Sequence, residues 1–164
     1  HLGFAIAADS DLDGDGYTDA AFGAYKDGTS IDDAGAVVVV DGSTKQVSGR
    51  LAGSRAGAML GASIGMRPLP DGGAELLAGA PGWRIAGERA GAIARHVGRI
   101  EGVVQVDTTT LIPSPTARAQ FGHAISARRD LDGDGIADII VGAPGWSTGA
   151  GRTGAVLFFR GDIP

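Results

Sequence analysis

Residues 121–144 read FGHAISARRDLDGDGIADIIVGAP, and this stretch holds the features that decide the fold. The pair Phe121-Gly122 opens a short apolar strand, an acidic loop follows at 130–138, and a second apolar strand ends in Gly142-Ala143-Pro144. The acidic loop has a close copy near the start of the chain, at 11–19. Self-similarity at a fixed period indicates a repeat architecture, and this signal outweighs all others in the chain.

A third, weaker copy of the pattern lies midway between these two. Three features recur in the same order in each copy: an apolar residue with glycine, a strand ending in Gly-Ala, and a later strand opening with Gly-Ala. The copies are Leu2-Gly3, Leu60-Gly61 and Phe121-Gly122; Gly23-Ala24-Tyr25, Gly79-Ala80-Pro81 and Gly142-Ala143-Pro144; and Gly35-Ala36-Val37, Gly91-Ala92-Ile93 and Gly154-Ala155-Val156. We therefore expect three units in one repeat region (1–164), at about 1–56, 57–117 and 118–164.

Each unit reads as strand, acidic loop, strand, long loop and strand. Fourth segments are expected near Gln46–Leu51 and Gly102–Asp107, and the third unit stops before its fourth strand. The second and third strands are almost continuously apolar, so both of their faces need cover. Units stacked around an axis supply that cover. The expected fold is all-β: three consecutive four-stranded propeller-type blades, the last incomplete.

Composition removes several classes of function. The chain has 164 residues and a net charge of −5 without a basic patch, which argues against nucleic-acid binding. It has no cysteine, which excludes disulfides and thiolate metal sites. No apolar stretch approaches the ~18 residues of a transmembrane helix. The chain starts at His1 rather than Met, so we expect a processed or excised segment whose signal sequence lies elsewhere.

The ordered pattern resembles three FG-GAP repeats, the blades of the integrin alpha-subunit propeller and of many bacterial surface proteins. Phe121-Gly122 and Gly142-Ala143-Pro144 match the family's name literally, and the other two copies are looser versions. The resemblance covers essentially the whole chain. It implies a β-propeller whose loops bind calcium and whose opposite face often binds partners.

The acidic loops carry aspartates at positions 1, 3, 5 and 9. An EF-hand would need a bidentate glutamate at position 12, which here is Phe22 or Val141 inside an apolar strand. Four carboxylates suit a hard cation that takes six or more oxygens, and FG-GAP blades use the same arrangement for calcium. The alternative is a solvated acidic turn. We expect two Ca²⁺ sites, with backbone carbonyls at position 7: Asp11, Asp13, Asp15, Tyr17 and Asp19; and Asp130, Asp132, Asp134, Ile136 and Asp138.

The middle loop lacks this set of acids. Aligning Glu75 with Asp19 puts Asp71 at position 5 and Arg67 at position 1. Calcium is not expected there. Arg67 either lies across the vacated site and pairs with Asp71 and Glu75, or it points to water.

Trp83 and Trp146 each follow Gly-Ala-Pro by two residues, in equivalent loops. They either cap the grooves between blades or form a protein- or glycan-binding patch. Arg160-Gly161-Asp162 is the tripeptide that integrins recognise, but so short a motif is weak evidence.

The expected function is a calcium-stabilised interaction module for adhesion or assembly, located outside the cell, on its surface or in the periplasm. The chain is not expected to be an enzyme, because its histidines are scattered (His1, His96 and His123) and its clustered acids belong to the loops. Alternatives are a glycan-binding lectin-like propeller and an accessory domain of a secreted hydrolase.

The chain is not expected to act alone, because propellers close with four to eight blades and three leave a gap. It is expected to be part of a longer propeller, to complete one with a different subunit, or to form a six-bladed ring from two copies, in that order of preference.

Overall fold

The computed structural model describes residues 1–106, 111–148 and 151–161. Within these ranges the chain forms strands β1 to β14 and no helix, which confirms the all-β class. No helix long and apolar enough to cross a membrane is present in the described part of the chain.

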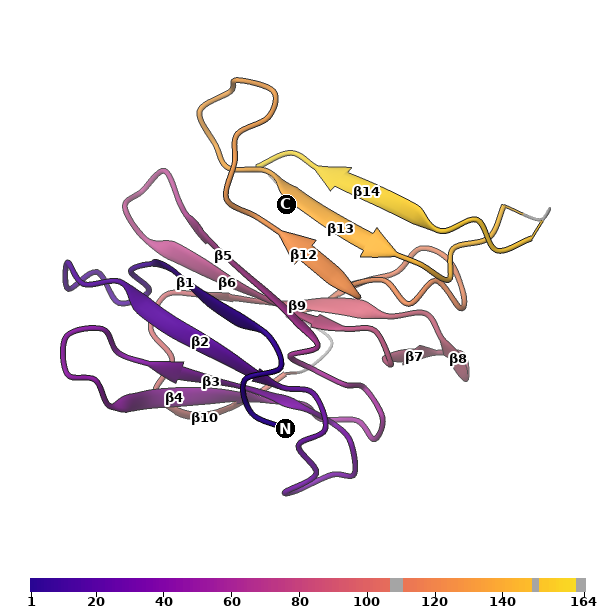
Figure 1. Ribbon diagram of the computed structural model, residues 1–164, viewed down its shortest axis with the longest axis horizontal. Helices are drawn as coiled ribbons and strands as arrows, with labels where there is room; N and C mark the ends of the chain where they lie inside the picture. Colours follow the sequence, from indigo (N-terminus) through magenta and orange to yellow (C-terminus); the bar gives the residue numbers. More distant parts are fainter. Residues whose placement is uncertain (107–110, 149–150, 162–164) are drawn as a thin grey trace.

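The strands form three main sheets and one short hairpin (Figure 1). The first sheet has the order β1-β2-β3-β4-β10, the second β11-β9-β6-β5 and the third β12-β13-β14. The strands are β1 (Ile6–Ser10), β2 (Asp19–Ala24), β3 (Ala36–Val40), β4 (Val47–Ala52) and β10 (Gly102–Gln105); β5 (Ser63–Pro68), β6 (Ala74–Ala80), β9 (Ala92–Val97) and β11 (Leu111–Pro113); β12 (Ala124–Ser126), β13 (Ile139–Ala143) and β14 (Ala155–Phe159); and the hairpin strands β7 (Arg84–Ile85) and β8 (Glu88–Arg89).

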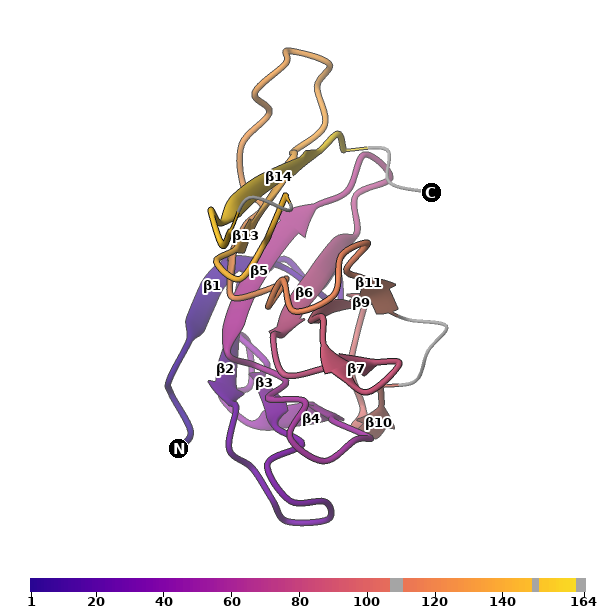
Figure 2. The same ribbon diagram turned by 90° about the vertical axis from the view of Figure 1, so that its right-hand side faces the viewer.

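The sheets follow one another in sequence order, and their first strands meet. Strand β1 contacts β5, and β12 contacts both β5 and β6. The second sheet therefore lies between the other two (Figure 1). The loop between β12 and β13 projects from the molecule, at the top of Figures 1 and 2.

The apolar core lies between neighbouring sheets. Strand β6 is buried along its whole length, and its adjacent residues Leu76 and Leu77 belong to two different core clusters. Successive strand residues point to opposite faces, so one strand serves both clusters. The continuous apolar pattern of this strand is thus explained by cover on both faces. Burial of each leucine contributes roughly 1.5–3 kcal/mol to the free energy of unfolding.

The prediction that the segment near Gly102–Asp107 forms the fourth strand of the second unit was wrong. Residues 102–105 form β10, which runs parallel to β4 in the first sheet, and Leu111–Pro113 supplies the fourth strand of the second sheet instead. Ile100 is buried in the first core cluster, close against Gly49 of β4, where a side chain would overlap the Ile100 carbonyl. This packing draws the segment to the first sheet. Asp107, the end of the expected strand, lies outside the described residues.

The third sheet has three strands in the described part of the chain. Its last strand, β14, pairs with β13 on one side only, and it exposes Val156 and Phe158. The corresponding strands of the other sheets, β3 and β9, are each flanked by a fourth strand.

Candidate metal centre

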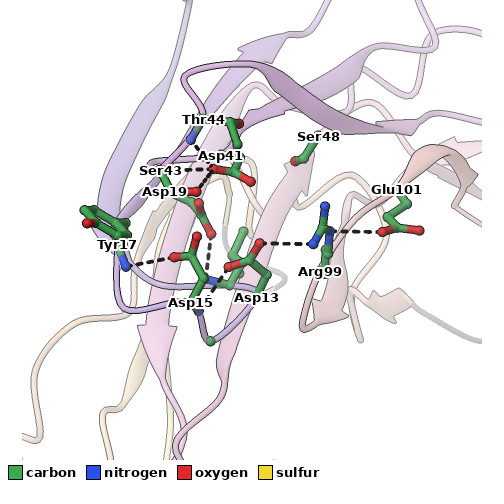
Figure 3. Close-up of polar contacts among 12 residues, drawn as sticks. Asp13, Asp15, Tyr17, Asp19, Asp41, Ser43, Thr44, Ser48, Arg99 and Glu101 are labelled. Atoms are coloured by element: carbon green, nitrogen blue, oxygen red, sulfur yellow. Dashed lines mark hydrogen bonds and ion pairs between the residues drawn. The ribbon is translucent and has the colours of Figure 1, made fainter.

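The first acidic loop joins β1 to β2 and is held by its own aspartates. Asp11 accepts hydrogen bonds from the backbone N–H groups of Gly14 (2.7 Å) and Gly16 (2.7 Å). These glycines have φ values of 78° and 92°, which only glycine adopts readily. Figure 3 shows the loop's carboxylates Asp13, Asp15 and Asp19 gathered beside Asp41.

The third acidic loop, between β12 and β13, folds in the same way. Asp130 accepts from the N–H groups of Gly133 (2.6 Å) and Gly135 (2.8 Å), whose φ values are 84° and 90°. Asp134 accepts from Ile136 N–H, as Asp15 does from Tyr17 N–H, both at 2.8 Å. The shared sequence of the two loops therefore produces one shared backbone conformation.

Each loop brings three carboxylates together, with one oxygen of each within 4.8 Å of the others. The groups are Asp11, Asp13 and Asp15 in the first loop, and Asp130, Asp132 and Asp138 in the third. Asp19 is outside the first group, and its two oxygens accept from Leu12 N–H (2.7 Å) and Gly42 N–H (2.9 Å). Asp134 is outside the second. The full four-aspartate sets and the Tyr17 and Ile136 carbonyl ligands stay predictions.

Asp138 supplies a direct test of whether a cation fits. Its side chain is 1% exposed, and Oδ2 accepts a hydrogen bond from Leu131 N–H (2.7 Å). Its Oδ1 is buried without a hydrogen-bond partner among the described residues. A buried charged oxygen without a partner is costly, and a hard cation held with Asp130 and Asp132 would satisfy it.

The electrostatics of the first loop also fit a cation. Burial raises the pKa of Asp13, and the negative charges of Asp15, Asp19 and Asp41 raise it further, against a hydrogen bond from Asp15 N–H. Burial raises the pKa of Asp11 as well, but the N–H groups of Gly16 and Gly14 outweigh it, so this pKa is lowered. The carboxylates therefore repel one another, and a divalent cation would relieve that repulsion.

In the third loop the pKa of Asp130 is lowered, chiefly by the N–H groups of Gly135 and Gly133. Its carboxylate is thus held in the charged form that a cation requires.

Each loop has an arginine beside it that the sequence did not associate with an acidic loop. Arg99 Nη1 lies 3.5 Å from Asp13 Oδ2 (Figure 3), and Arg160 Nε lies 3.1 Å from Asp132 Oδ2. Both arginines are largely exposed, and such pairs contribute roughly 0–1 kcal/mol. Arg160 is the first residue of Arg160-Gly161-Asp162, of which Asp162 lies outside the described residues.

Asp41, another residue that the sequence did not single out, gives a pH-dependent prediction. Hydrogen bonds from Thr44 N–H and the Ser43 hydroxyl, followed by Ser43 N–H, lower its pKa from 3.8 to about 2. A carboxyl with a lowered pKa stabilises the fold above its ordinary value, and that stability is lost as pH falls from 3.8 toward 2. Asp41→Asn is expected to have a lower melting temperature than wild type at pH 6. The difference between the two melting temperatures should shrink as the pH is lowered toward 2. A gap that stays constant over this range would contradict the assignment.

The structure corrects the alignment of Arg67. This residue is on strand β5, directly opposite Glu75 on β6, and not at the first position of a loop. Its guanidinium pairs with Glu75 (Nε–Oε2 2.7 Å), and both side chains are buried, at 1% and 0% exposure. Its Nη1 donates to the carbonyls of Ala137 (2.6 Å) and Gly161 (3.0 Å) in the third unit. Arg67 therefore ties the second sheet to the third.

The expected pairing of Arg67 with Asp71 was wrong. Asp71 is exposed in the turn between β5 and β6, and its carboxylate accepts a hydrogen bond from Gly73 N–H (3.1 Å). The strand register places Glu75, not Asp71, opposite Arg67. The second partner of Glu75 is Arg95 on β9.

The two tryptophans take part in packing. Trp83 is 4% exposed, belongs to the first core cluster and stacks under the Arg55 guanidinium, 4.5 Å from the ring centroid. Trp146 is half-buried against the second cluster. Neither ring stands free on the surface, which favours the groove-capping interpretation over a binding patch.

Comparison with known families agrees with this geometry. Residues 121–159 match the FG-GAP repeat family. The match covers β12, the third acidic loop, β13 and β14, so this part of the chain is an FG-GAP repeat. The first acidic loop repeats the sequence and the backbone conformation of the loop inside the matched segment.

Proposed function

We propose that this chain is a calcium-binding FG-GAP β-propeller module for extracellular protein–protein interaction, adhesion or assembly, in which calcium is structural. The observation that carries the proposal is the unpartnered buried Oδ1 of Asp138, inside a loop whose other carboxylates converge on it. The proposed role is binding and assembly rather than catalysis.

Calcium in this role would stabilise the hairpins that connect β1 to β2 and β12 to β13. Four of the eight loop aspartates, Asp15, Asp130, Asp132 and Asp134, are exposed, so calcium could exchange with solvent at both loops. Extracellular modules bind calcium with a Kd of roughly 10⁻⁴–10⁻³ M, a range that supports a location where calcium is millimolar. At calcium concentrations ~10–100 times above Kd, each site adds about 1.4–2.7 kcal/mol to the free energy of unfolding.

Calorimetric titration of the calcium-free chain tests this proposal. We expect close to two calcium ions per chain, and a melting temperature that rises with calcium and falls with chelator. The double variant Asp130→Asn/Asp132→Asn should retain one site, because the first loop is untouched. Asp71→Asn, in the middle turn, is the matched control and should retain both.

Identical melting curves in chelator and in millimolar calcium would overturn the structural role. A third ion that disappears in Asp71→Asn would contradict the assignment of the middle hairpin as an ion-free unit.

The proposed propeller is supported by the way the sheets are ordered, since β5, the first strand of the second sheet, contacts β1 on the first sheet and β12 on the third. No specific observation favours the lectin-like alternative, because Trp83 is buried and Trp146 packs against the core.

A further inference from the structure

Five exposed arginines gather around two adjoining pockets of the second and third units. A basic pocket of about 370 Å³ and a neighbouring pocket of about 460 Å³ share Arg84. Glu88 is the one acid that lines either pocket among the described residues. The arginine cluster consists of Arg84, Arg89, Arg118 and Arg152 at the basic pocket and Arg55 at its neighbour.

The fold brings this cluster together from separate parts of the chain. Arg84 and Arg89 are on the β7–β8 hairpin, which follows β6 and precedes β9 (Figure 1). Strand β6 begins at the turn that corresponds to the acidic loops, so the hairpin is at the opposite end of the sheet from them. Arg118 precedes β12, and Arg152 precedes β14. No basic run marks the cluster in the sequence, because the hairpin, the β11–β12 loop and the β13–β14 loop each supply only one or two of its arginines.

The positive charge of the cluster is largely uncompensated. Apart from Arg118, none of its members makes an ion pair with a described residue. Arg84 donates to the Gly87 carbonyl (2.8 Å), which carries no net charge. In a chain whose net charge is −5, such a local concentration of positive charge attracts negatively charged groups.

The hairpin itself places two of these charges against each other. Arg84 is directly opposite Arg89 in the antiparallel pairing of β7 with β8. Like charges at directly opposite positions destabilise a pair of strands. An anion bound between the two guanidinium groups would remove this repulsion.

The cluster already holds one carboxylate, which shows the chemistry that it accepts. Arg118 donates to both oxygens of Glu88, from Nε at 2.8 Å and from Nη2 at 2.9 Å. These hydrogen bonds and the charge of Arg118 lower the pKa of Glu88; burial opposes them, and the charge of Arg84 lowers this pKa further. The planar guanidinium group suits such two-point binding of carboxylates.

We propose that the arginine cluster binds an acidic segment of another protein, whose carboxylates pair with Arg84, Arg89 and Arg152. The proposal gives a partner chemistry to the interaction module proposed above and rests on that proposal.

The surroundings of the cluster favour a protein segment over a nucleic acid or a glycan. Ile85, next to Arg84, is 38% exposed and lines the neighbouring pocket, where it offers a contact for an apolar side chain of the partner. Trp83 in that pocket is 4% exposed and lies under the Arg55 guanidinium, so its ring is not available for stacking on a base or a sugar. The net charge of −5 also opposes a long phosphate backbone.

Fluorescence anisotropy in millimolar calcium tests the proposal with a labelled peptide in which glutamates flank a leucine. Wild type is expected to bind this peptide and not its glutamine counterpart. Arg84→Gln/Arg89→Gln should weaken binding about tenfold or more, because two charged hydrogen-bond donors are lost. Arg128→Gln/Arg129→Gln is the matched control: it removes the same charge from exposed positions beside the third acidic loop, and it should bind within about twofold of wild type, because salt screens distant charges.

Glu88→Gln separates binding from damage to the fold. It removes the competing carboxylate and releases Arg118, so it should bind the glutamate peptide about threefold more tightly than wild type. A substitution that merely disturbed the hairpin would weaken binding instead, and that result would contradict the proposal.

Absence of peptide binding at millimolar concentration would overturn the proposal, as would equal weakening in the two double arginine variants. Tighter binding of a single-stranded DNA oligonucleotide or of a sulfated glycan than of the peptide would overturn it in favour of that polymer. Calcium content is measured on the same samples: two ions in a chain that does not bind the peptide would refute the role of the arginines and leave the calcium proposal intact.

Discussion

Replacing Arg67 by methionine is expected to lower the free energy of unfolding by about 3–5 kcal/mol. Methionine fills much of the same volume but leaves buried Glu75 with Arg95 as its remaining ion-pair partner, and it removes both hydrogen bonds to the third unit. For a chain of this length, such a loss lowers the melting temperature by roughly 6–20 °C. Urea denaturation followed by circular dichroism measures it directly.

Arg118→Met is the matched control for this substitution. Arg118 makes two hydrogen bonds to Glu88, at 2.8 and 2.9 Å, but both side chains are exposed. Loss of that pair should cost less than about 1 kcal/mol. Adding Glu75→Gln to Arg67→Met should recover part of the loss, because the buried side chain that has lost one of its two ion pairs is then uncharged. Equal, small losses in Arg67→Met and Arg118→Met would show that the buried pair does not join the sheets.

The acidic loops could be predicted from the sequence because their conformation is local. Asp11 and Gly14 are three residues apart, and Asp130 and Gly133 repeat that spacing, so the same turn forms wherever the pattern occurs. The second strand of each unit could also be predicted, because its apolar residues are consecutive in the sequence. Such a continuous apolar run indicates a strand that is covered on both faces.

Strand β10 could not be predicted in this way. Its pairing with β4 joins Gly102 to Gly49, and it depends on Ile100 packing against a glycine of an earlier unit. A parallel pairing between distant segments leaves no short-range signal. The apolar residues of this segment indicated a strand but not which sheet would receive it.

Arg67 shows how the choice of reference residue affects an alignment of repeats. Counting back from Glu75 places it in the acidic loop, whereas counting forward from Leu60 places it on the strand, where it lies. The second count also equates Arg67 with Asp9 and Arg128, each seven residues after the residue that opens its unit. Asp9 and Arg128 form an ion pair at 3.4 Å, so opposite charges at equivalent repeat positions were a usable signal.

Gly79→Ala is expected to destabilise the chain by about 3 kcal/mol or more, although it adds a single methyl group. Gly79 is the next-to-last residue of β6, and its added Cβ would lie less than 3.0 Å from both the Gly122 carbonyl oxygen and the Ser63 hydroxyl. The carbonyl belongs to the backbone of the next unit, so relief requires the second and third sheets to separate. Gly23→Ala should behave alike, because it meets the Gly61 carbonyl at the other internal junction.

The matched control is Gly142→Ala at the equivalent position of the third sheet. The atom nearest to the added Cβ is 3.4 Å away, so the methyl group meets no clash. The substitution should leave the free energy of unfolding unchanged or raise it by up to about 1 kcal/mol, because alanine restricts the unfolded chain more than glycine does. Comparing the stability changes of Gly79→Ala and Gly142→Ala separates two effects. One is the clash with a neighbouring unit, and the other is the preference of any strand for alanine over glycine. Equal effects at Gly79 and Gly142 would mean that close approach of the sheets does not explain these glycines.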